Sequence, residues 1–330
     1  MQLKCLKVQM GLAVCGLLQA TAPAVEAAEG DWEIDTAVLF YSESDGRVSA
    51  FEPAVFAGKA LNDDERIDLR LVFDALTGAT PNGAHPSTAA QTFTTPSGNA
   101  SYTTNPGELP LDDTFRDARV SLGADWEIAL DRLSKITWGG SISNEYDYLS
   151  LGASATYAQD FNNRNTTLTT AFALNNDTIS PLGGIPSELL PMRVAGSSTN
   201  REGIDDSKVI TDILFGVTQV LNRSTVMQLN FSIGQVDGYQ NDPFKVVSVI
   251  DPVTGLPANG SGSSFFDTAT TGNLPYVYER RPDSRQRNVL FLKTVHHFDE
   301  DVINFSYRYY DDDWDVTSHT LDMRYRYELK

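Results

Sequence analysis

The four histidines are the side chains best suited to acid–base or metal chemistry, but their positions in the sequence do not indicate a shared site. His296 and His297 are neighbours, so in a strand they point to opposite faces and cannot bind one metal ion together. The same alternation separates Ser318 from His319, so these two do not form a nucleophile–base pair. His85 lies in a long polar stretch. The short motifs of serine hydrolases, zinc peptidases and phosphate-binding loops are absent. We therefore expect no catalytic residue, no metal site, no cofactor and no enzymatic activity, and a hydrolase is the least favoured alternative.

Three arginines lie within six residues near position 280 of an otherwise acidic chain. Arg280, Arg281 and Arg285 are candidates to bind an anion. With Asp242 they are also candidates for a ligand site or for a constriction where a loop folds inward. The alternative is that the arginines form ion pairs that hold the loop in place. The carboxylates available for such pairs are Asp242, Glu279 and Asp283. We favour the ion pairs and keep both interpretations open.

The elements that would position these side chains are strands, because about twelve segments of the chain alternate apolar and polar residues. In residues 66–74 every second side chain is apolar and most of those between are charged. Residues 225–236, 302–310 and 320–328 repeat the alternation, so each segment has one apolar and one polar face. The segment lengths suit the roughly 9–11 residues that a tilted strand needs to cross hydrocarbon. Candidate lumen charges on the polar face are Arg66, Asp68, Arg70, Asp74, Arg119, Asp322, Arg324 and Arg326.

The long polar stretches fall on one side of this series of strands. They follow the third, seventh and ninth segments, near residues 76–112, 178–205 and 240–284, whereas connections after even-numbered segments are short. Long loops on one side and tight turns on the other are typical of an outer-membrane β-barrel. A soluble sandwich has no reason to sort its loops in this way, because both of its ends face water. We predict an all-β fold, an antiparallel up-and-down transmembrane β-barrel with about twelve strands in this chain.

The first 27 residues have the organisation of a secretory signal peptide, with Lys4 and Lys7 before an apolar run and a small-residue cleavage site after it. We expect residues 28–330 to form one barrel domain. Both cysteines lie in the signal, so the mature chain would have no disulfide and no thiol ligand. Loss of Lys4, Lys7 and Glu26 would change the net charge from −19 to −20. A chain this acidic is repelled by nucleic acid, whose binding depends on neutralising phosphates.

Two segments fit the strand pattern poorly. In residues 48–57 a carboxylate and Pro53 interrupt the alternation, and a proline inside a strand indicates a bulge or a break. In residues 287–295 the more apolar face contains both Phe291 and Lys293. We retain both segments as strands.

Eight motifs of the sequence carry a family resemblance: Asp74–Ala84, Gln91–Thr94, Pro110–Phe115, Glu145–Ala153, Asn241–Lys245, Glu279–Arg285, Asp312–Trp314 and Ser318–Thr320. They resemble those of an uncharacterised family of Gram-negative outer-membrane barrels, domain-of-unknown-function family 3570, and the resemblance covers essentially the whole mature chain. The resemblance implies a β-barrel in the outer membrane, but no established activity, so it assigns no functional residues. Similar proteins continue for several more strands, and outer-membrane barrels commonly end in an aromatic residue rather than in Lys330. We therefore expect this chain to be part of a truncated barrel of 14 to 16 strands.

The expected function is a passive, porin-like channel for small polar solutes, with the long loops outside the cell. The alternative is a closed barrel whose long loops serve as a structural or binding platform. In both cases the expected partners are outer-membrane lipid, lipopolysaccharide and, during insertion, the barrel-assembly machinery. The expected location is the outer membrane, reached by export through the periplasm.

Overall fold

The structure is a computed structural model, and it describes residues 31–43, 48–87, 90–95, 100–193, 195–250, 276–298 and 300–327. The predicted signal peptide and Lys330 lie outside these ranges. Within the described ranges, no helix has the length and apolar character needed to span a membrane.

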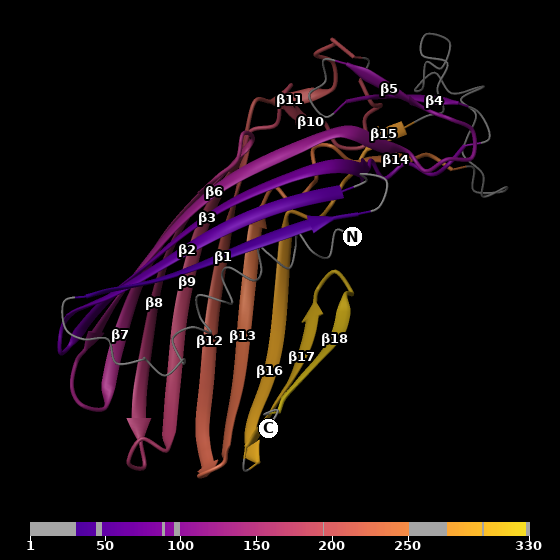
Figure 1. Ribbon diagram of the computed structural model, residues 1–330. Helices are drawn as coiled ribbons and strands as arrows, with labels where there is room; N and C mark the ends of the chain where they lie inside the picture. Colours follow the sequence, from indigo (N-terminus) through magenta and orange to yellow (C-terminus); the bar gives the residue numbers. More distant parts are fainter. Residues whose placement is uncertain are drawn as a thin grey trace.

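Twelve strands form one antiparallel sheet in which every strand pairs with the next main-sheet strand along the chain (Figure 1). This confirms the predicted all-β, up-and-down barrel class and the count of about twelve strands. β1 and β18 stand at the two ends of the order, and no register in the described strands joins them. The strands are β1 (Trp32–Ser42), β2 (Val48–Asn62), β3 (Glu65–Pro81), β6 (Leu111–Ala129), β7 (Ser134–Asn144), β8 (Tyr148–Phe161), β9 (Thr166–Ile179), β12 (Asp206–Asn222), β13 (Thr225–Gly238), β16 (Ser284–Phe298), β17 (Asp301–Asp312) and β18 (Thr317–Arg326).

Alternation along each strand gives the sheet two chemically different faces. Leu69, Leu71 and Phe73 on β3 point outward and are exposed, whereas Val72 between them is buried. Arg119 on β6 lies opposite Asp74 in the register and is also buried. We call the face that contains Arg119 the inner face and the apolar one the outer face. The sheet curls (Figure 1). Inner-face side chains from different strands therefore line one interior.

Tryptophans form a row on the outer face near the short turns. Trp32 on β1 lies opposite Lys59, which lies opposite Ile67, and the register continues to Trp126 and Trp138. All three tryptophans are between 43% and 50% exposed. Amphipathic rings in such a row suit the boundary between hydrocarbon and headgroups.

The three long connections follow β3, β9 and β13, at the same end of the sheet (Figure 1). Each contains two short strands: β4 (Gln91–Thr94) and β5 (Ser101–Thr104), β10 (Ile185–Pro186) and β11 (Arg201–Gly203), and β14 (Val246–Ser248) and β15 (Tyr276–Tyr278). The first connection is shorter than the predicted 76–112, because β3 continues to Pro81 and β6 begins at Leu111. These extensions lack apolar alternation, so the sequence pattern did not identify them as strands.

The proline in β2 interrupts one ladder without breaking the strand. β2 pairs continuously with β1, including Val38 opposite Pro53. With β3, pairing stops at Phe51 opposite Ala75 and resumes in the same register at Ala54. Proline has no N–H to donate, so of the two predicted outcomes the ladder with β3 shows a break and not a bulge.

The strand β16 turns its mixed face inward. Lys293 lies opposite Gln228 and Phe291 opposite Asn230, both on the inner face of β13. The outer face of β16 is instead formed by residues such as Leu290, which is 39% exposed. The difficulty in the sequence pattern came from treating the face with Phe291 as the lipid-facing one.

Candidate functional site: the inner face and the loop cap

Arginines on the first strands form ion pairs with carboxylates on the inner face. Arg66 on β3 lies 2.9 Å from Asp68 and 3.1 Å from Glu33 on β1. Arg119 on β6 lies 3.1 Å from Asp74 on β3, and its side chain is only 8% exposed. Four of the predicted lumen charges are thus paired. These contacts connect β1, β3 and β6 through their side chains as well as their backbones.

A fifth predicted residue, Arg70, lies 3.7 Å from Asp125 on β6. The three predicted residues on β18 share the inner face by register, since Asp322 lies opposite Ser306. They are in a different environment, however: Arg324 lies 3.3 Å from Asp322, with side chains 80% and 50% exposed. Arg326, opposite Val302, is also exposed.

A buried ion pair that was not predicted from the sequence joins β12 to β16 across β13. The Nη2 atom of Arg287 lies 3.0 Å from both carboxylate oxygens of Asp212. Between them the register places Gly234, where any Cβ would overlap the side chains of both partners. Gly58 plays the same part on β2, beneath the guanidinium of Arg66. One feature of the sequence could have indicated this pair: a glycine occupies the polar face of β13, and the strands on either side of it carry charges of opposite sign.

The three loop arginines do not converge. Arg281 contacts Glu279 at 2.9 Å, and Arg280 contacts Glu188 of the second long connection at 3.3 Å. The backbone N–H of Phe244 donates to Asp242 at 3.0 Å, so this carboxylate accepts a hydrogen bond within its own turn.

Arg285 lies outside that loop, on β16, and reaches a buried carboxylate on the next strand. Its Nε atom donates to Asp312 at 2.9 Å, and its guanidinium lies over the ring of Trp314 at 4.4 Å. Tyr310 donates to the same carboxylate at 2.6 Å. The arrangement connects β16 to β17 and to the turn that follows it.

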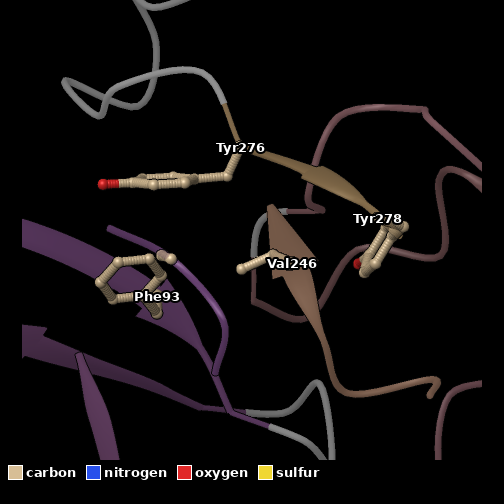
Figure 2. Close-up of a cluster of buried hydrophobic side chains, with 5 residues drawn as sticks. Phe93, Val246, Tyr276 and Tyr278 are labelled. Atoms are coloured by element: carbon tan, nitrogen blue, oxygen red, sulfur yellow. The ribbon is translucent and has the colours of Figure 1, made fainter. Parts of the chain in front are cut away.

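The described parts of residues 82–110, 180–205 and 239–283 pack together, and we call this unit the loop cap. Its buried centre contains Phe93, Val246, Tyr276 and Tyr278 (Figure 2). Phe93 is 1% exposed, and its ring centroid lies 4.8 Å from that of Tyr276. The sequence indicated three separate loops, whereas the structure joins them in one small core.

Backbone hydrogen bonds reinforce the contacts between loops. The N–H of Met192 donates to the carbonyl of Tyr276 at 2.8 Å, and that of Tyr278 donates to Leu190 at 3.0 Å. On the other side, the N–H of Val246 donates to Asn82 at 2.9 Å. The third loop therefore lies between the first and the second and binds to both.

The turn between β7 and β8 contains carboxyl groups with displaced pKa values. Burial, followed by repulsion from Asp117, raises the pKa of Glu145 to about 7. The same two causes raise the pKa of Asp147 to about 6. The positive charge of Arg119 lowers the pKa of Glu145, but by less than burial and Asp117 raise it. The carboxyl groups of Glu145 and Asp147, at this end of the sheet, therefore take up protons as the pH falls through the range from about 7 to about 6.

Two of the strand histidines make ordinary polar contacts. His296 is 2.8 Å from the hydroxyl of Thr225, and His319 is 2.8 Å from the hydroxyl of Tyr307. Across the described ranges, no three or more histidines, cysteines or carboxylates are grouped so as to hold a metal ion.

A family model described as "Protein of unknown function (DUF3570)" matches residues 8–330. No curated protein matches the chain.

Solved structures with similar folds include outer-membrane receptors and a porin. The siderophore receptor PirA from Acinetobacter baumannii matches 93% of this chain with a TM-score of 0.42 and 9% identity. A mutant of the ferric enterobactin receptor PfeA from Pseudomonas aeruginosa matches 92% with a TM-score of 0.45 and 9% identity. The chain spans 42% of each receptor. The NanC porin matches 86% of this chain and 97% of its own, with a TM-score of 0.36 and 9% identity.

Proposed function

The chain belongs to the DUF3570 family, which has no assigned activity, and from that premise we propose that it is a passive, porin-like channel for small polar solutes in a Gram-negative outer membrane. The observation that carries the proposal is the sorting of side chains in the curled sheet. Charged and hydrogen-bonding groups line the interior, and apolar groups cover the exterior.

The outer face supports a membrane location. Side chains such as Leu71, Phe215 and Leu229 are between 42% and 52% exposed, although they lie in the middle of regular strands. Exposed apolar surface costs about 25 cal/mol per Å² in water, so a continuous face of this kind is stable only against lipid or protein. The row of Trp32, Trp126 and Trp138 suits one interface of that lipid. In the orientation we propose, the loop cap lies outside the cell and contacts lipopolysaccharide.

The inner face supports a hydrated interior. Asp74, Arg119, Asp212 and Arg287 lie on the inner face, and the side chains that alternate with them along each strand lie on the apolar outer face. Charges at these positions are therefore kept away from lipid. A barrel wall of this composition can conduct polar solutes without a bound cofactor or a chemical step, and we propose no enzymatic activity.

Single-channel recording tests the proposal. The full-length protein would be refolded from urea into a planar bilayer, and current recorded at two KCl concentrations. We expect discrete steps whose size rises with salt. If the protein migrates as a folded, heat-modifiable barrel on gels but passes no current, it is not a channel.

The loop cap favours a second candidate, a closed barrel that binds a partner or ligand through its loops. Three loops that share a core present a defined surface. On the second loop an open hollow of about 540 Å³ is lined by the turn at Gly183 and Gly184 and by Arg201, whose guanidinium lies 4.6 Å from the ring of Tyr278. A ligand that raises the unfolding temperature of a non-conducting barrel would support this candidate.

A further inference from the structure

Opposite charges separate between two arms of the inner face. Strand register assigns the inward residues: on β2, β3 and β6 as far up as Asp117 they include six carboxylates and three arginines. On β16 and β17 they include four cations and one carboxylate, Asp312. β3 and β16 are separated by six strands in the sheet order, about half of its width. The sheet curls (Figure 1), and the strands between them put the two arms on different parts of the wall around one interior.

Ion pairs neutralise part of each arm, and the charges left over keep the same separation. On the first arm Glu52 and Asp117 form no ion pair within the described strands, and one carboxylate oxygen of Asp117 is buried without a hydrogen-bond donor. Their neighbours Asp74 and Arg119 are paired with each other. Two uncompensated negative charges therefore lie near the loop-cap end of this arm.

The opposite arm contains two cations that form no ion pair in the described part of the chain. Lys293 on β16 lies between the neutral side chains of Gln228 and Ser306. Arg308 on β17 lies opposite Phe291, and its Nε and Nη2 atoms have no acceptor among the described residues. No carboxylate of the described residues neutralises this guanidinium or this ammonium, so their positive charges attract an anionic group of a solute in the interior.

We propose that the channel prefers dipolar solutes, zwitterions such as free amino acids and short peptides, over neutral or singly charged solutes of equal size. This inference rests on the proposed function. A zwitterion can lie across the lumen with its carboxylate toward Lys293 and Arg308 and its ammonium toward Glu52 and Asp117. A simple ion is attracted by one arm and repelled by the other, and a neutral solute gains nothing from either.

Liposome swelling with matched solutes tests the inference. Glycylglycine is the zwitterion and N-acetylglycinamide the neutral solute of similar size, each applied to vesicles that contain the full-length protein. We expect glycylglycine to enter about fivefold faster, the ratio that corresponds to about 1 kcal/mol for charges near 4 Å in water. The preference should decrease at 1 M KCl, where screening acts within about 3 Å. Equal uptake of both solutes would overturn the inference but leave the channel intact, whereas uptake of neither would count against the channel itself.

Paired variants identify the residues. Lys293→Gln with Arg308→Gln should abolish the preference and make KCl currents more cation-selective, while the charge-conserving Lys293→Arg with Arg308→Lys should retain both properties. If the glutamine pair does not fold, Glu52→Gln with Asp117→Asn tests the other arm and should shift selectivity toward anions. A glycylglycine preference that survives neutralisation of either arm would show that these charges do not cause it.

Discussion

Replacing Arg287 by methionine should destabilise the protein by about 3 kcal/mol. Its side chain and that of Asp212 are only 16% and 10% exposed, and they meet at 3.0 Å. Removing one partner of a buried ion pair costs about 3–5 kcal/mol, because it leaves an uncompensated charge in a poorly hydrated site. We take the lower end because some lumen water reaches both groups. The double variant Arg287→Met with Asp212→Leu removes both charges and should recover most of the loss.

Urea unfolding in lipid vesicles, followed by tryptophan fluorescence, provides the assay. The matched control is Arg324→Met, which breaks an ion pair whose side chains are 80% and 50% exposed and should cost only about 0–1 kcal/mol. With Asp212→Leu alone as the second single variant, the double variant gives the coupling energy of the buried pair, expected to be about 2–3 kcal/mol. If Arg287→Met and the control lose equal stability, or the double variant loses as much as the single one, the pair is fully hydrated and the reasoning is wrong.

Three further perturbations test other parts of the structure. The pKa of Glu145 is raised from 4.5 to about 7, so between these pH values the folded state binds a proton that the unfolded state does not. The free energy of unfolding should therefore fall as pH rises from about 4.5 to about 7. In urea titrations at several pH values, Glu145→Gln should reduce this dependence of stability on pH. Phe93→Ala should cost the loop cap about 3–5 kcal/mol and accelerate its cleavage by protease while the barrel stays resistant, whereas uniform resistance would contradict a shared core. Leu229→Arg places a charge on the outer face of β13 and should lower the free energy of unfolding in lipid by about 2–4 kcal/mol. Ser232→Arg, on the inner face of the same strand, should lower it by less. Equal losses of stability would argue against a lipid-facing exterior.

The main sheet could be predicted from the sequence because alternation is a local property. Residues 66–74 and 225–236 show which side chains face inward without reference to any partner strand. The structure agrees for Leu69, Leu71 and Phe73, which are exposed, and for Asp74, which pairs with the buried Arg119. The prediction was weaker where one strand has a mixed face. Phe291 and Lys293 share a side of β16, and only the register with Gln228 shows that this side is inward.

The loop cap could not be predicted in this way. Phe93 and Tyr276 are separated by most of the chain, and nothing in the local pattern of either indicates the other. The ion pair between Asp212 and Arg287 could not be predicted either, because its partners lie on strands that are not neighbours in the sheet. Sequence reasoning located the polar face correctly but could not say which charges on it meet. For the three loop arginines the structure shows contacts with Glu188, Glu279 and Asp312, only one of which was considered.

The glycines beneath the ion pairs have a consequence for the order of assembly. Arg66 reaches Glu33 over Gly58, so the contact joins the first and third strands of a set of three. The contact between Arg287 and Asp212 over Gly234 skips a strand in the same way. A hairpin inserted by itself cannot form either contact, because one partner always belongs to the next hairpin along the chain. At these two places the newly added strand therefore locks the hairpin before it, which favours sequential assembly and disfavours the loss of β3 or β16 from the completed wall.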